Sequence, residues 1–255
     1  MTTEPTSWAE PASHAFRRGV TASLPMLIGF IPLAFILGAQ GAQHGLSGVG
    51  MSLMTAMNYA GGSEFAAVAL WSATPSLLVI MMTTWLINSR HIVLGATITP
   101  HIVRAGTKTP ATLLALFLLC DECWALSMQE IERKRKAGVA PEYLFSLPFH
   151  LGTGFTLWCT WWLTTGVGAV FGASLGDLTQ WGFMMAFPAT FIGLSVAMRP
   201  KVEKCLPIVV SAIVAALSSF ALPMHWCILA ATIAGVLTAG IFPDLPVGEN
   251  RGKRN

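Results

Sequence analysis

A few ionisable side chains lie within or beside long stretches of sequence that otherwise carry no charge. No Asp, Glu, Lys or Arg occurs from Gly19 to Ser63, and Glu64 follows directly. Arg90 and the adjacent Asp121-Glu122 pair border further apolar runs. Each charge at the centre of a bilayer costs about 2.5 kcal/mol or more, so charges retained there usually bind an ion, relay a proton or contact a polar solute. These residues therefore indicate solute or proton movement across a membrane.

The segment around Glu64 predicts an interrupted helix near 58–65. Two glycines followed by Ser and Glu free backbone groups in mid-membrane, which is tolerated only where protein or water lines a cavity. The N-terminal end of a half-helix attracts a carboxylate, and the opposite end favours an ammonium group, so an amino acid suits both. The residues expected to bind substrate are Asn58, Tyr59, Gly61, Gly62, Ser63 and Glu64.

A second group of residues is expected to couple protons or to form an ion pair. It comprises Asp121, Glu122, Arg90 and His91. Adjacent helical residues point about 100° apart, so the two carboxylates cannot easily share one pore. One can face a cavity while the other pairs with Arg90 or caps backbone. Alternatively, Arg90 reaches the headgroups along its own aliphatic stem.

The composition excludes several classes of protein. Hydrophobic residues make up 54% of the chain and charged ones 11%, and the mean hydropathy is +0.63, which is typical of an integral membrane protein. The basic residues flank apolar runs rather than forming one face, so no nucleic-acid partner is expected. Cys120 and Cys123 have C-x-x-C spacing without a second Cys or His pair, so we expect neither a metal nor another cofactor.

The elements that must position these residues are membrane-spanning helices. The chain predicts an all-α polytopic membrane helix bundle of about eight transmembrane segments, each of roughly 20 residues. Pro25, Pro32 and Pro188 are expected to kink their helices. The predicted spans are 20–39, 46–71, 75–97, 110–129, one tilted span within 143–176, 180–198, 205–221 and 224–242.

Clusters of Lys and Arg predict the orientation of the bundle. They favour a cytoplasmic N-terminal tail at 1–18, a single transmembrane domain at 19–243 and a cytoplasmic polar tail at 244–255, in a bacterial inner membrane. Arg104 and Lys108 would then lie outside the cell. A seven-span arrangement with 46–71 or 110–129 re-entrant therefore stays open.

A weak internal similarity predicts a two-fold repeat. Residues 35–39 precede the 51–62 segment much as 170–173 precede 183–193, at an offset of about half the chain. Paired halves that each contain a broken helix are common in secondary transporters. Chance similarity among helices rich in Gly, Ala and Phe is the alternative.

These features favour a secondary transporter over an enzyme. No Walker motif is present, so this chain is not expected to hydrolyse ATP itself. Two alternatives stay open, namely a channel-like permease for another small solute and an intramembrane serine hydrolase with a Ser63–His150 dyad. Otherwise His150 is expected to hydrogen-bond to a neighbouring helix. Trp158, Trp161 and Trp162 are expected in an interfacial belt or in packing.

At these motifs the chain resembles the AzlC family, the large subunit of bacterial branched-chain amino acid exporters. The resemblance runs from about Phe16 to Phe242. It implies export of leucine, isoleucine, valine and methionine across the inner membrane, driven by the proton-motive force. It also implies a small hydrophobic membrane partner of the AzlD type, encoded separately. The residues that carry it are Ser23-Leu24-Pro25, Ile31–Phe35, Tyr59–Phe65, Arg90-His91, Asp121-Glu122 and Pro188-Ala189.

Two positions depart from the pattern of that family. Its usual Y-A-G-x-S-Q-F has Gln where this chain has Glu64, and its usual D-x-R-H has Asp where this chain has Asn88. One carboxylate is lost and one appears nearby. We therefore expect positions 64 and 88 to face each other around Arg90, so that the local charge is kept.

Overall fold

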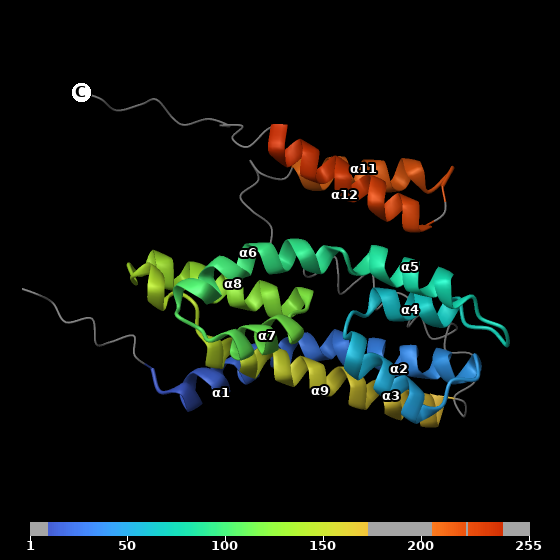
Figure 1. Cartoon of the computed structure of the whole chain (residues 1–255), viewed down its shortest axis with the longest axis horizontal. Coiled ribbons are helices and arrows are strands. Elements are labelled where there is room, and N and C mark those ends of the chain that lie inside the picture. The colour runs from blue at the N-terminus through green and yellow to red at the C-terminus, as the bar shows by residue number, and fades with distance from the viewer. Residues whose placement is uncertain (1–9, 173–205, 223, 242–255) are drawn as a thin grey trace, which may run out of the picture. The chain divides into compact units, whose positions relative to one another are not determined.

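The computed structural model describes residues 10–172, 206–222 and 224–241, which fall into two compact units (Figure 1). The described residues are helical and contain no strand, which confirms the predicted all-α class. The predicted 180–198 span, Pro188 and the second part of the proposed repeat lie outside the described residues. The single transmembrane domain and the number of spans stay predictions.

The first eight helices of the first unit form four consecutive pairs. Within each pair, a short break separates the two helices. Residues 24–26, 59–61, 89 and 118–120 form these breaks, and α9 follows as one continuous helix of 25 residues. The helices are α1 (Ala12–Ser23), α2 (Leu27–Gln43), α3 (Gly48–Asn58), α4 (Gly62–Ala69), α5 (Leu77–Asn88), α6 (Arg90–Arg104), α7 (Thr109–Phe117), α8 (Asp121–Lys136) and α9 (Leu147–Phe171).

Among the described helices, two are long and apolar enough to cross a bilayer. They are the α1–α2 run, Ala12–Gln43, and the α5–α6 run, Leu77–Arg104. Pro25 lies in the 3-10 turn between α1 and α2, where it interrupts the helix as predicted, and Pro32 lies inside α2. The first long helix therefore begins earlier and ends later than the predicted 20–39 span.

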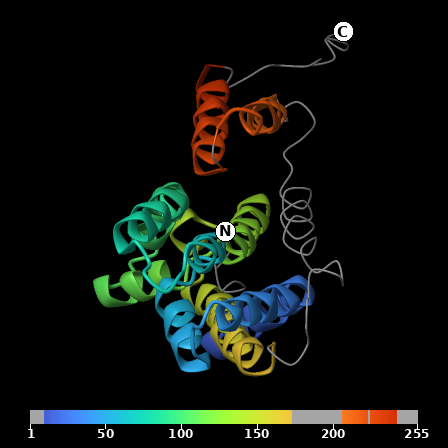
Figure 2. The same ribbon diagram turned by 90° about the vertical axis from the view of Figure 1, so that its right-hand side faces the viewer.

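Helix α9 packs against α1, α2 and α3, and glycines make the contact close (Figures 1 and 2). Gly19 and Gly38 lie against the backbone of α9, and Gly152 and Gly168 lie against the backbone of α1 and α2. A Cβ at Gly38 would overlap the carbonyl of Thr165. Small residues let membrane helices approach in this way, so that dispersion contacts hold the pair together.

The second unit consists of α11 (Leu206–Ser218) and α12 (Met224–Ile241). The two helices pack against each other, and Ser211 Oγ donates to the carbonyl of Ala231 at 3.0 Å. Their bounds agree with the predicted 205–221 and 224–242 segments.

An ion-pair cluster joins α1 to the basic end of α8. Arg18 lies 2.9 Å from carboxylate oxygens of both Glu10 and Glu130, and its guanidinium lies 5.3 Å from the ring centroid of Phe149. Partial burial raises the pKa of Glu130, but hydrogen bonds from Arg133 and Arg18 outweigh it and lower that pKa from 4.5 to about 2. The charged form of Glu130 is thus favoured by folding.

Replacing Glu130 with Gln is expected to lower the melting temperature of the purified protein at pH 7. Stability from a carboxylate with a lowered pKa is complete above its unfolded value near 4.5 and disappears as the pH falls towards 2. We expect a loss of roughly 2–4 °C at pH 7, the shift given by about 1 kcal/mol in a domain of this size. Thermal unfolding in detergent from pH 7 to pH 3 measures it.

Glu132→Gln is the matched control, because Glu132 pairs with Arg135 on the exposed surface of the same helix. Its melting temperature should stay close to that of the wild type. A Glu130→Gln deficit that is the same at pH 7 and pH 3 would contradict the assigned role of the ion pair.

Candidate functional site

Three of the helix breaks surround one small cavity of about 30 Å³. They are the α3–α4 break, the α5–α6 junction and the α7–α8 break. Among the residues predicted for the site, the cavity is lined by Tyr59, Gly61, Gly62, Arg90, His91, Asp121 and Glu122. The structure therefore brings together three short segments, 59–62, 90–91 and 121–122, whose neighbours in sequence are about 30 positions apart.

The predicted interruption between α3 and α4 is confirmed and depends on two unusual backbone conformations. Tyr59 is left-handed, with φ 46° and ψ 50°, and Gly61 has φ 40° and ψ −78°. Glycine alone adopts the second conformation without strain, because it has no Cβ. The Tyr59 hydroxyl donates to Cys120 Sγ at 3.2 Å, which joins this break to the α7–α8 break.

The Glu64 carboxylate is fully buried and accepts hydrogen bonds from three N–H groups. Trp161 Nε1 donates to one oxygen at 2.7 Å, and the Ala60 N–H and Asn58 Nδ2 approach the other at 3.3 and 3.4 Å. Buried carboxylates need such partners. Trp161, expected in a belt or in packing, also lines the cavity, and its ring centroid lies 4.9 Å from that of Phe30.

Asn58 connects Glu64 to position 88. Asn88 Nδ2 donates to Asn58 Oδ1 at 3.0 Å, and Asn58 Nδ2 donates to Ser63 Oγ at 2.9 Å and approaches Glu64. The expectation that positions 64 and 88 face each other around Arg90 is therefore wrong. They are joined through the amide of Asn58, the last residue of α3. The other three residues predicted to bind substrate lie outside the cavity lining and are hydrogen-bonded to one another through the Asn58 amide. They are Asn58, Ser63 and Glu64.

Arg90 joins the three breaks. Its guanidinium lies 2.9 Å from Asp121 Oδ2 and donates to the carbonyl of Ala60 at 3.2 Å. This carbonyl belongs to the α3–α4 break, and Asp121 is the first residue of α8. The ion-pair alternative for Arg90 is thus confirmed, and an interfacial position is not needed to explain its charge.

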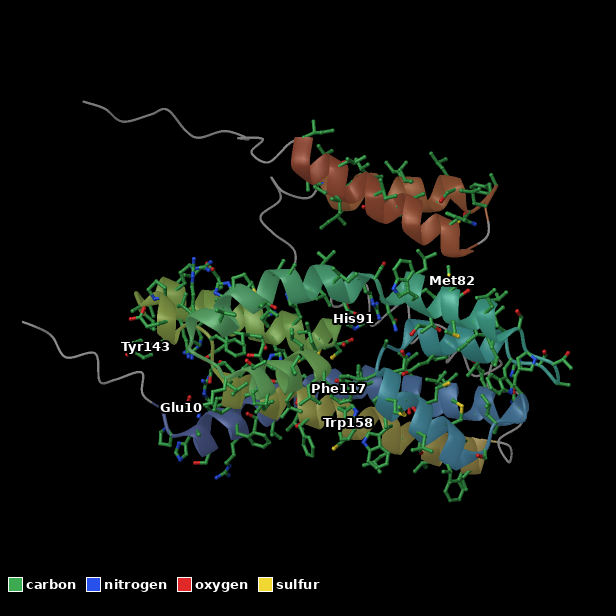
Figure 3. All side chains as sticks on the ribbon, viewed as in Figure 1. Glu10, Met82, His91, Phe117, Tyr143 and Trp158 are labelled. Atoms are coloured by element: carbon green, nitrogen blue, oxygen red, sulfur yellow. The ribbon has the colours of Figure 1, made fainter. Side chains whose placement is uncertain are left out.

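Asp121 and Glu122 both line the cavity. The expectation that they cannot share one hollow is wrong, because the cavity lies beyond the N-terminus of α8 rather than along its side. Glu122 is 6% exposed, in the first turn of that helix, where a carboxylate interacts favourably with the helix dipole. His91 lies at the α5–α6 junction, with Nδ1 at 3.2 Å from the Asn88 carbonyl (Figure 3).

The structure does not bring Ser63 and His150 together as a catalytic dyad. Ser63 Oγ accepts from Asn58, whereas His150 Nδ1 lies 2.8 Å from Ser127 Oγ and its Nε2 lies 2.9 Å from the Ala115 carbonyl. His150 is fully buried and joins α9 to α8 and α7. The expected hydrogen bond from His150 to a neighbouring helix is confirmed.

The cavity of about 30 Å³ has room for only two or three water molecules, given that a site for one water needs roughly 10–15 Å³. An amino acid does not fit within this volume. Charged groups and broken helices around a shared hollow are typical of membrane transport proteins. Phe30, Leu33 and Trp161 add an apolar wall beside the charged one.

Comparison with known proteins identifies the family. The AzlC protein family model matches residues 25–175, more than half of the chain, and the chain belongs to the AzlC family of membrane proteins. Inner membrane protein YgaZ of Escherichia coli is 29% identical over 92% of this chain and 94% of its own length. No solved structure matches the chain.

Two further relatives match a smaller share of the chain. An uncharacterized membrane protein of Archaeoglobus fulgidus is 29% identical over 64% of this chain and 65% of its own length. The Branched-chain amino acid transport protein AzlC of Bacillus subtilis is 22% identical over 74% of this chain and 70% of its own length.

Proposed function

We propose that this protein is a secondary exporter of branched-chain and other hydrophobic L-amino acids, coupled to protons, in the bacterial inner membrane. The observation that carries the proposal is the cavity at the three helix breaks, which places an Arg90–Asp121 ion pair beside an apolar wall. The printed name of the Bacillus subtilis relative, a branched-chain amino acid transport protein, supports the substrate class.

The two walls suit the two ends of such a substrate. Phe30, Leu33 and Trp161 offer an apolar surface to an aliphatic side chain, as in most small-molecule sites. Gly62, the first residue of α4, lines the cavity, and the N-terminal end of a helix favours a carboxylate. The cavity must widen on one side of the membrane at a time for an amino acid to enter and leave.

Glu122 is the carboxylate we assign to proton transfer. It is buried, it lines the cavity, and Asp121 beside it is engaged with Arg90. Proton uptake neutralises Glu122 and removes the cost of a charge in hydrocarbon, so its protonation can accompany the switch between the two sides. We further propose both termini in the cytoplasm, a multi-pass domain at 19–243 and a small AzlD-type membrane partner.

Counterflow of labelled leucine in proteoliposomes, with and without the partner, tests this function. The wild type should exchange leucine saturably and accumulate it when a pH gradient is imposed. Exchange that does not saturate would favour a channel-like permease instead, and no exchange of any hydrophobic amino acid would contradict the proposal.

Glu122→Gln is expected to separate leucine exchange from accumulation driven by the pH gradient. Leucine counterflow should persist. Accumulation driven by the pH gradient should fall at least roughly 10-fold, because the carboxylate that takes up and releases the proton is lost. Glu142→Gln, on the exposed loop after α8, is the control. Equal accumulation by wild type and Glu122→Gln would assign the proton to another residue.

A further inference from the structure

The paired side chains Arg90 and Asp121 differ from Glu64 in how they are held. Arg90 and Asp121 are 31% and 20% exposed, and both line the cavity. Glu64 is 0% exposed and its oxygens are engaged by Trp161, Ala60 and Asn58. A solute that enters the cavity therefore meets the Arg90–Asp121 pair, while the Glu64 carboxylate stays with its own donors.

We propose that the Arg90–Asp121 ion pair occupies the place of the substrate's own two charges and opens to receive them. This inference rests on the proposed function. Arg90 binds the α-carboxylate of the amino acid, and Asp121 binds its α-ammonium group. In the described structure the two side chains are paired with each other.

The chemistry of the two side chains supports this assignment. A guanidinium presents planar paired donors that match a carboxylate, and a carboxylate accepts readily from an ammonium group. Insertion of a zwitterion between them replaces one ion pair with two, and the net charge of the cavity stays the same. Neither side chain is left without a counter-charge in a medium of low dielectric constant, where an unpaired charge is costly.

The second contact of Arg90 links substrate binding to the α3–α4 break. Its guanidinium also donates to the Ala60 carbonyl at 3.2 Å, and the Ala60 N–H contacts Glu64 at 3.3 Å. When Arg90 turns towards a substrate carboxylate, this carbonyl must find a new donor or move. The backbone between α3 and α4 is therefore the element expected to rearrange on binding.

Analogues that lack one charge test the proposal in the wild-type protein. Leucinamide has no carboxylate, and 4-methylpentanoate has no ammonium group. Each leaves one member of the pair unmatched, so each should compete at least about 100-fold more weakly than leucine for binding of labelled leucine. Competition by either analogue at the level of leucine would overturn the assignment of the corresponding residue.

Two variants test which residue binds the carboxylate of the substrate and which binds its ammonium group. Arg90→Gln should lose most of the discrimination between leucine and leucinamide and keep that against 4-methylpentanoate. Asp121→Asn should do the reverse. A residue with only a structural role would weaken all three ligands equally, so this crossed pattern separates the two roles. Glu142→Gln, at an exposed position outside the cavity lining, should retain the wild-type profile.

The outcomes distinguish the inference from the function. If the wild type binds no leucine, the proposed function is wrong. If it binds leucine and the analogues compete equally well, or if both variants keep the wild-type profile, the function stands and the inference is wrong. Should either variant fail to yield folded protein by size-exclusion chromatography, the analogue profile of the wild type decides alone.

Discussion

Replacing Glu64 with Gln is expected to lower leucine transport roughly 10- to 100-fold, and adding Asn88→Asp is expected to restore most of it. The Gln side chain presents an NH2 group to donors that now point at a carboxylate. One buried N–H from Trp161, Ala60 or Asn58 is then left without an acceptor, which costs about 1–3 kcal/mol.

The rescue follows from the amide that joins the two positions. Asn88 donates to Asn58 Oδ1, and Asn58 Nδ2 points to Glu64, so the hydrogen bonds run in one direction towards the carboxylate. If Asn58 rotates its amide by half a turn, the direction of these hydrogen bonds reverses. The Gln side chain at position 64 then donates to Asn58, and Asn58 donates to the Asp carboxylate at position 88. The site keeps one negative charge in either arrangement. We therefore expect the two departures from the family pattern to compensate each other.

Leucine counterflow in the two single variants and the double variant measures the coupling between these positions. Asn88→Asp alone should also impair transport, because it places a second carboxylate in the hydrogen-bonded series that already ends on Glu64. With Asn58→Leu in the background the rescue should disappear, since the connecting amide is gone. Defects of the single variants that simply add in the double variant would show that the two positions are independent.

Replacing Gly38 with Ala is expected to destabilise the protein by about 1–3 kcal/mol, and Gly38→Leu is expected to prevent folding. The new Cβ meets the Thr165 carbonyl and the Ala169 amide nitrogen, 2.6 Å away, and these backbone atoms of α9 cannot move as a flexible side chain can. The two helices would have to separate and lose the close contacts that hold them together.

Gly95→Ala provides the matched control, because its Cβ would have only Leu116 Cδ2 within reach, at 4.0 Å. Alanine favours a helix more than glycine does, so this variant should keep or raise the melting temperature. Thermal unfolding in detergent and the yield of monodisperse protein measure both effects. Equal melting temperatures for Gly38→Ala and the wild type would contradict the close packing of α2 on α9.

Much of the architecture could be predicted from the sequence because hydrophobicity and backbone preference are local properties. Uncharged runs of sufficient length predict helices for a bilayer, and two glycines beside Ser and Glu predict the break that the structure shows at Tyr59–Gly61. The rarity of charge in these runs also selected the residues that surround the cavity. Each of these inferences needs only neighbours along the chain.

Only the tertiary structure decided which of these residues touch. Trp161 contacts Glu64 across 97 positions of sequence, and Asn88 contacts Asn58 across 30. The sequence pattern left open which carboxylate pairs with Arg90 and placed Glu64 opposite position 88, whereas the fold pairs Arg90 with Asp121 and joins position 88 to Glu64 through Asn58. Partner choice depends on how closely helices approach, and the glycines of α2 and α9 set that distance through backbone contacts that no single helix contains.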